Sequence, residues 1–316
     1  MRFSIGITIH NEERNIGRLL DRLQGDGLEA RGLIRVVVVS SGSTDGSDRI
    51  VADKAAGWPL LTLLTEPERR GKASAINRYL EAARDSPLLV LMSGDVVPAP
   101  GATALLLDAF EDPEVGMAGG RPAPAGEPVR LVHHVARLQW DLHHEVSLRA
   151  PKLGEVVAFR NVLDAIPADT AVDEAAIEAA LTAKGYRFRY VAQAIITNKG
   201  PDTLADFLKQ RRRIAAGHAH LRQTSGYRVS TDDNRRVLGI VARYLARHPS
   251  QLPLAAITAG LEATGRVLGL YDLKVRGRNP FIWDIAASTK NPDGPTGRTA
   301  GGPTGRTAGA LEEDRS

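Results

Sequence analysis

Apolar residues form four runs in the first 100 positions, and each run has the spacing of a β-strand. The first run alternates apolar residues with small or polar ones from Phe3 to Ile9, as in a strand with one buried face. The run that starts at Leu88 is continuous, as in a strand buried on both faces. The predicted strands are 3–9, 33–39, 60–65 and the run from Leu88.

Between these runs the apolar positions recur every three or four residues, which is the pattern of an amphipathic helix. Asn11 is predicted as the N-cap of the first helix, with Glu12 and Glu13 in its first turn. Because strands alternate with helices, the connections are predicted to be crossovers. The first 120 residues therefore predict an α/β fold, a Rossmann-like and mainly parallel sheet with flanking helices.

The pattern changes after about residue 120, where helical spacing dominates. We expect short strands at 154–160, 186–191 and 194–197, and helices at 130–148, at 173–183, from Pro201, at 235–247 and at 251–270. The end of the chain repeats GPTGRTAG and lacks the apolar residues of a core, so it is predicted to be disordered. The expected domains are a main domain at 1–222, a C-terminal helical segment packed on it at 223–290, and a tail at 291–316.

Composition excludes several classes of function. The chain has no cysteine, which excludes disulfides, a thiol nucleophile and zinc held by thiolates. No apolar run reaches the roughly 18 residues of a membrane span, and the alternating N-terminus does not resemble a signal peptide. A cytoplasmic location is expected, with peripheral contact at the inner membrane face as an alternative. For the helix at 252–273, core packing, contact with lipid and a homodimer face all stay open.

Positive charge is concentrated in the C-terminal third. The net charge is only +4, but 206–247 holds ten Lys and Arg residues against three Asp. This favours an anionic partner such as a diphosphate or a phospholipid surface. Nucleic acid is not expected, because only 5% of the residues are aromatic and stacking side chains are scarce.

Polar turns follow all four predicted strands, at 8–13, 40–46, 69–77 and 93–95. The carboxyl ends of parallel strands meet at one edge of a sheet, where ligands bind, so these turns are expected to form one crevice. Asp95 ends the turn after the most apolar strand. The turns contain neither GxGxxG nor a P-loop lysine motif, which argues against a dinucleotide site.

Seven stretches resemble the family-2 glycosyltransferases of the GT-A fold, in the same order and over about residues 3–222. They are ITIHNEERNIGRLL, VVVVSSGSTDGSDRIV, RRGKASAINRYL, LVLMSGDVVP, GEVVAFRN, VDEAAIEAAL and DFLKQRRRIAAGH. The resemblance implies an inverting hexosyltransferase that takes a sugar from a nucleoside diphosphate, as in polysaccharide or glycolipid biosynthesis. The implied acceptor is a hydroxyl of a sugar, a lipid-linked molecule or a small molecule, and the implied cofactor is Mg²⁺ or Mn²⁺.

The resemblance also assigns roles to individual residues. Glu174, or alternatively Asp173, is the implied base, and Asp95 the implied metal ligand, with Asn198 where the family has a ligand His. A hard cation suits carboxylate and phosphate oxygens. Gln210, Arg211 and Arg213 are implied at the diphosphate and acceptor. The implied nucleotide-sugar-binding residues are Thr8, His10, Glu12, Ser41, Asp45, Lys72 and Asp95.

Departures from the family pattern keep a second function open. Ser41 stands in place of an Asp that reads the base, Ser93 in place of the first acid of the metal turn, and Asn198 in place of the ligand His. These changes favour the alternative of a non-catalytic protein that binds a nucleotide sugar or a glycan. Outside the motifs, Lys152 and Glu155 are expected at the donor-sugar edge. Trp140, His143 and His144 are expected either in the acceptor groove or in packing.

Overall fold

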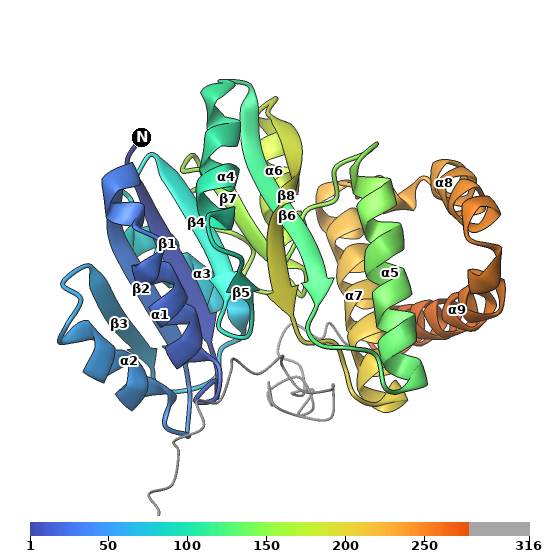
Figure 1. The fold of residues 1–316 in the computed structure, drawn as a ribbon, viewed down its shortest axis with the longest axis horizontal. Helices are drawn as coiled ribbons and strands as arrows, with labels where there is room; N and C mark the ends of the chain where they lie inside the picture. The colour runs from blue at the N-terminus through green and yellow to red at the C-terminus, as the bar shows by residue number, and fades with distance from the viewer. Residues whose placement is uncertain (278–316) are drawn as a thin grey trace, which may run out of the picture.

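The structure is a computed structural model that describes residues 1–277. Its centre is one eight-stranded sheet with the order β3-β2-β1-β4-β7-β6-β8-β5 (Figure 1). β1 is parallel to β2 and β4, β2 is parallel to β3, and β7 is antiparallel to β4 and β6. The strands are β1 (Phe3–Ile9), β2 (Leu33–Ser41), β3 (Leu61–Glu66), β4 (Leu88–Ser93), β5 (Val97–Pro98), β6 (Val115–Pro124), β7 (Val156–Arg160) and β8 (Arg187–Asn198).

Helices cover both faces of the sheet, and the alternation of side chains along the strands decides which helix meets which face. Phe3, Ile5 and Ile7 pack with α1 (Ile16–Gly25), α2 (Ser47–Ala55) and α4 (Ala102–Asp108). The opposite face, with Val37 and Leu91, packs against α3 (Lys72–Ala82) and α6 (Asp173–Ala183). On that face Tyr79 of α3 lies against Gly6, where an added Cβ would stand 2.3 Å from the ring. This close approach explains a glycine in the middle of a buried strand.

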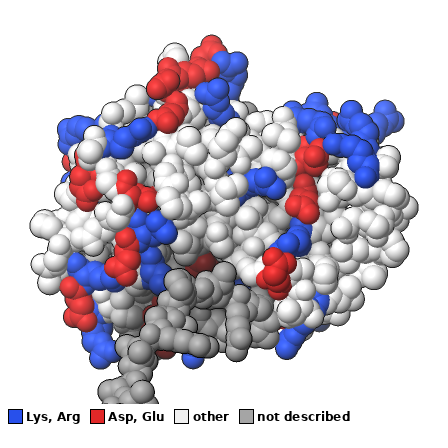
Figure 2. Space-filling view, viewed as in Figure 1, with Lys and Arg blue, Asp and Glu red and all other residues white. Residues whose placement is uncertain are grey.

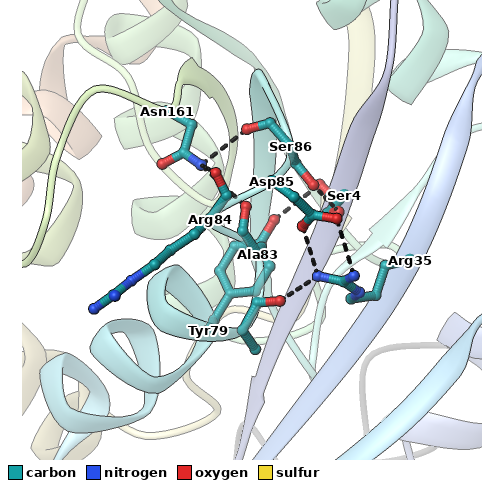
Figure 3. A network of polar contacts seen from close by, with 9 residues as sticks. Ser4, Arg35, Tyr79, Ala83, Arg84, Asp85, Ser86 and Asn161 are labelled. Atoms are coloured by element: carbon teal, nitrogen blue, oxygen red, sulfur yellow. Dashed lines mark hydrogen bonds and ion pairs between the residues drawn. The ribbon is translucent and has the colours of Figure 1, made fainter.

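A polar network fixes α3 and the start of β4 at the amino ends of the central strands (Figure 3). Tyr79 Oη donates to the Ser4 carbonyl at 2.8 Å, and Asn161 Nδ2 donates to the carbonyls of Ala83 and Ser86 at 3.0 and 2.8 Å. Arg35 adds an ion pair to Asp85, with Nη1 2.9 Å from Oδ1. The side chains thus donate hydrogen bonds to backbone carbonyls of Ser4, Ala83 and Ser86. This network lies at the end of the strands opposite to their carboxyl ends.

The remaining long helices form a helical layer beside the sheet (Figure 1). They are α5 (Leu131–Ser147), α7 (Leu204–Ser225), α8 (Asn234–Arg247) and α9 (Leu252–Lys274), and the short 3₁₀ turns are Leu28–Arg31, Ala109–Glu111, Ser230–Asp232 and Pro249–Gln251. α9 packs closely on α7, because Gly265 and Gly269 leave room for the α7 backbone and the Arg211 Cβ. The core-packing interpretation of this segment is therefore confirmed for one of its faces. Basic side chains gather over α8 (Figure 2), whose sequence contains four arginines.

Two expectations about the elements need correction. Asn11 is not an N-cap: its φ is 55°, and α1 begins at Ile16 with Asn15 as the cap residue. The strands predicted at 186–191 and 194–197 are one strand, β8, whose pairing with β6 shifts register after Gly120. β6 itself was not predicted. The expected tail at 291–316, and 278–290 before it, lie outside the described residues.

Within residues 1–277, no helix combines the length and the apolar character needed to cross a bilayer. The nearest approach in length is α9, with 23 residues. One side of α9 is nevertheless apolar and exposed, with Val267 66% and Tyr271 46% accessible. The expectations of lipid contact and of a homodimer face stay predictions.

Candidate functional site

A cavity of about 1710 Å³ opens at the carboxyl ends of β1, β2 and β4 and extends between the helices of the helical layer. The sheet supplies one wall, because the parallel strands end together there and polar turns follow them. The first turns of α3 and α6 and the middle of α7 supply the others. The predicted crevice is therefore present, and it is deeper than the four strand turns alone would make it.

Nearly all the residues assigned from the sequence line this one cavity. They are Thr8, His10, Glu12, Ser41, Lys72, Asp95, Asp173, Glu174, Asn198, Gln210, Arg211 and Arg213. Two of them also support the walls: His10 Nδ1 lies 2.7 Å from the Ser41 carbonyl oxygen, and Glu12 accepts a hydrogen bond from Asn15 Nδ2 at 2.8 Å. Residues up to 205 positions apart in the chain thus meet at one place, from Thr8 to Arg213.

Asp45 is the exception, and its expected place in the nucleoside wall stays a prediction. It is not among the residues that line the cavity. Its carboxylate accepts from the backbone N–H groups of Ser47 and Glu13, at 3.0 and 3.2 Å, and so closes the turn before α2. Burial alone would raise the pKa of Asp45, but these hydrogen bonds and the Ser47 hydroxyl lower it. Asp45 therefore has a local structural partner for each oxygen.

Lys72 joins two acids that begin α6. Its Nζ lies 2.9 Å from Glu174 Oε1 and 3.4 Å from Asp173 Oδ2. Asp173 and Glu174 occupy the first turn of α6, where the positive end of the helix dipole favours carboxylates. Burial opposes the charge of Lys72, yet Glu174 and Asp173 together raise the pKa of Lys72. The result is a partly buried cation paired with two acids in the wall of the cavity.

The two acids differ in their surroundings. Burial acts to raise the pKa of Glu174, but the charge and the hydrogen bond of Lys72 outweigh it and lower that pKa. Burial dominates at Asp173 and raises its pKa, because Lys72 is farther away. Asp173 is 2% exposed, and its Oδ1 has no hydrogen-bond partner among the described residues. Of the two acids, Glu174 is therefore the one whose pKa Lys72 holds below its ordinary value.

Asp95, Glu155 and Asn198 line another part of the cavity, where the charge of Asp95 acts on Glu155. Burial raises the pKa of Asp95, and Lys72 and Arg213 partly oppose it. Burial, then the charges of Asp95 and Glu174, raises the pKa of Glu155 to about 7. Asn198 Oδ1 is buried and has no partner within the described chain. No cluster of three His, Cys, Asp or Glu side chains suited to a metal occurs in residues 1–277.

The three consecutive arginines of α7, Arg211 to Arg213, have different partners. Arg213 lies near Asp173, Glu174 and Glu155, whose charges partly offset the burial that lowers its pKa. Arg212 instead pairs with Asp272 of α9. Arg211 Nη1 lies 3.2 Å from Glu262 Oε1. Of the predicted clamp, Arg213 is therefore the cation that faces the acids.

Two residues in or directly behind the cavity wall were not assigned from the sequence. Glu178, one turn after Glu174, accepts from the Leu153 N–H at 3.2 Å and from Tyr227 Oη at 3.1 Å. Arg266 reaches the cavity from α9. Glu178 has the i, i+4 spacing from Glu174 that places both on one helix face, and this signal was available in the sequence. The sequence contains no comparable signal for Arg266, because the position of this side chain depends on how α9 packs.

Glu178 predicts a specific dependence of stability on pH. Burial, partly opposed by Lys152, raises its pKa from 4.5 to about 7. In the unfolded chain Glu178 releases its proton near pH 4.5. Its contribution to the free energy of unfolding is therefore complete below that pH and is lost as the pH rises through 7. At about 1.4 kcal/mol per pKa unit the loss is roughly 3 kcal/mol. Urea unfolding at about pH 5 and about pH 8 should show a smaller fall in stability for Glu178→Gln than for the wild type.

The same substitution at Glu127, whose side chain is 83% exposed, controls for the loss of one carboxylate. An equal fall in stability between the two pH values in the wild type and in Glu178→Gln would contradict the assignment of this titration to Glu178.

Comparison with known proteins agrees with this architecture. The model of the family described as glycosyl transferase family 2 matches residues 4–180. No curated protein matches the chain. A mannosyltransferase from Pyrobaculum calidifontis, solved with GDP-Man and Mn²⁺, superposes with a TM-score of 0.61 at 23% identity over 88% of this chain and 87% of that one.

Glucosyl-3-phosphoglycerate synthase from Mycobacterium tuberculosis superposes less closely. Its complex with Mg²⁺ and uridine diphosphate gives a TM-score of 0.51 at 20% identity, over 72% of this chain and 80% of that one. At these identities the superpositions establish the fold, and the family match covers more than half of the sequence. The chain therefore belongs to glycosyl transferase family 2, and its sheet, with the helices around it, is a GT-A fold.

Proposed function

We propose that this protein is an inverting glycosyltransferase that moves a sugar from a nucleoside diphosphate to an acceptor hydroxyl. The observation that carries the proposal is the meeting of Lys72, Glu174, Asp95 and Arg213 in one cavity at the strand ends. A diphosphate leaving group needs positive charge, and an attacking hydroxyl needs a base. The cavity offers both, side by side.

Several features support a divalent ion as cofactor, Mg²⁺ or Mn²⁺. Structures of similar fold contain Mn²⁺ with GDP-Man or Mg²⁺ with uridine diphosphate. In this chain Asp95 would hold the ion together with Asn198 Oδ1, which has no partner in the described part of the chain. Oxygen ligands of this kind suit a hard cation. When bound, the ion would supply positive charge to the diphosphate oxygens.

The residues of this chain would carry the other parts of the reaction. Glu174 accepts the proton of the acceptor hydroxyl, the freed oxygen forms a bond to the anomeric carbon, and the bond from that carbon to the diphosphate oxygen breaks with its electron pair. Attack opposite the leaving group inverts the anomeric configuration. Arg213 lies where it would offset the charge of the departing diphosphate, and Lys72 keeps Glu174 ionised before the transfer. Thr8, His10, Glu12 and Ser41 would line the nucleoside end.

The proposal is tested by a panel of nucleotides and nucleotide sugars with and without Mn²⁺. We expect one donor class to raise the melting temperature, more so with the metal, because a ligand that binds only the folded state stabilises it. The stabilising donor is then incubated with candidate acceptors, and NMR of the product reports its anomeric configuration. Stabilisation without any transfer or hydrolysis would instead support the alternative of a non-catalytic nucleotide-sugar-binding protein. A product with retained configuration would contradict the single displacement.

A further inference from the structure

The cavity continues past Glu174 into a basic subsite that the proposed reaction does not use. We define this subsite by five residues from four separate segments: His143 of α5, Lys152 of the following loop, Arg211 and His218 of α7, and Arg266 of α9. All five line the same cavity as Glu174. The charge of Glu174 acts on both Lys152 and His218, which places the subsite next to the base.

Two polar atoms of this subsite lack hydrogen-bond partners among residues 1–277. His143 Nδ1 and Arg211 Nε are buried and make no hydrogen bond among the described residues. Neither Lys152 nor Arg266 forms an ion pair within residues 1–277, although both side chains line the cavity. Arg211 Nε is a donor, and His143 Nδ1 is a donor in the tautomer that carries its proton there. A buried donor without a partner is costly, so this wall favours a ligand that accepts hydrogen bonds.

The charge of the subsite is positive. Burial and the neighbouring cations, Lys152 first among them, lower the pKa of His143 and of His218 to about 3, so both rings are neutral at physiological pH. Burial and Arg211 also lower the pKa of Lys152, while Glu178 raises it. Glu262 pairs with Arg211, and Glu178 is partly protonated near neutral pH. The cations Lys152 and Arg266 therefore remain uncompensated by a direct ion pair.

We propose that this subsite binds a phosphate group of the acceptor and so directs the acceptor hydroxyl to Glu174. The inference rests on the proposed function and narrows its acceptor to a phosphorylated molecule. A phosphate presents several acceptor oxygens to cations and N–H donors that arrive from different directions, as the five side chains do here. The same chemistry occurs in a small phosphorylated metabolite and in the headgroup of a phosphorylated lipid.

The experiment measures binding of glycerol 3-phosphate, with glycerol as the neutral comparison, by calorimetry and by histidine NMR of the full chain. We expect glycerol 3-phosphate alone to bind and to raise the pKa of His143 and His218, because an added anion favours the charged rings. Lys152→Met should weaken binding by about tenfold or more. Arg266→Met is the second variant, since this side chain is exposed and its loss does not disturb the core. Lys184→Met, on an exposed residue outside the cavity, is the matched control.

Phosphatidylcholine vesicles with and without phosphatidic acid distinguish the lipid source from the soluble one. Binding of either phosphorylated probe that both variants weaken supports the subsite. Failure of both probes to bind, or binding that neither variant weakens, overturns it. Thermal stabilisation by the nucleotide sugar is measured in the same samples: if the donor stabilises the protein and neither phosphate probe binds, this inference fails while the glycosyltransferase proposal stands.

Discussion

Glu174→Gln is expected to lower the rate of sugar transfer by about 10²- to 10⁴-fold, the usual contribution of a general base. Glutamine keeps the size of the side chain and an oxygen that can face Lys72, 2.9 Å away in the wild type. It cannot accept a proton from the acceptor hydroxyl. The loss should therefore appear in kcat, while the melting temperature still rises on addition of the donor.

Two further variants serve as controls for this prediction. Asp173→Asn tests the alternative base, because Asp173 is the neighbouring acid and has one oxygen without a partner among residues 1–277. Glu81→Gln, on the exposed side of α3, is the matched control for the substitution itself. A large loss in Asp173→Asn with a small one in Glu174→Gln would move the base to Asp173. Losses below about tenfold in both would contradict a carboxylate base in this cavity.

The sheet and the position of its ligand edge follow from local patterns in the sequence, whereas the roles of individual site residues came from the family resemblance. The alternation from Phe3 to Ile9 and the continuous run from Leu88 were sufficient to predict β1 and β4, whose ends carry Thr8 and Asp95. Parallel pairing then brings both residues to one edge without further information. Asp45 was assigned to the same edge on its motif, and its carboxylate accepts hydrogen bonds from the backbone N–H groups of Ser47 and Glu13.

Contacts between distant segments could not be predicted in this way. Lys72 and Glu174 are 102 positions apart in the chain, and no periodic pattern of apolar residues predicts that they pair. β6 escaped prediction because its glycines and prolines are unusual in a strand, although Gly116, Gly119 and Gly120 are explained by the side chains that pack over them. The basic subsite depends on how α9 packs against α7, which is a tertiary result rather than a local one.

Lys72→Met is expected to reduce the free energy of unfolding by about 3 kcal/mol near neutral pH and to abolish transfer. Removing one partner of a buried ion pair leaves the other charge without compensation. Here two acids lose their cation, and Asp173 is only 2% exposed. Without Lys72 the pKa of both acids should rise in the folded state, so the stability loss should grow as the pH is raised from about 4 to about 8. Urea unfolding across this range measures it.

The exposed pair between Lys54 and Asp21 provides the matched control, since Asp21 is 65% exposed. Lys54→Met should cost at most about 1 kcal/mol at any pH, because water already solvates its partner. Adding Asp173→Asn to Lys72→Met should recover part of the lost stability, since it removes the more deeply buried of the two uncompensated carboxyl groups. A loss below about 1 kcal/mol in Lys72→Met, or one that does not change with pH, would mean that Arg213 rather than Lys72 compensates the acids of α6.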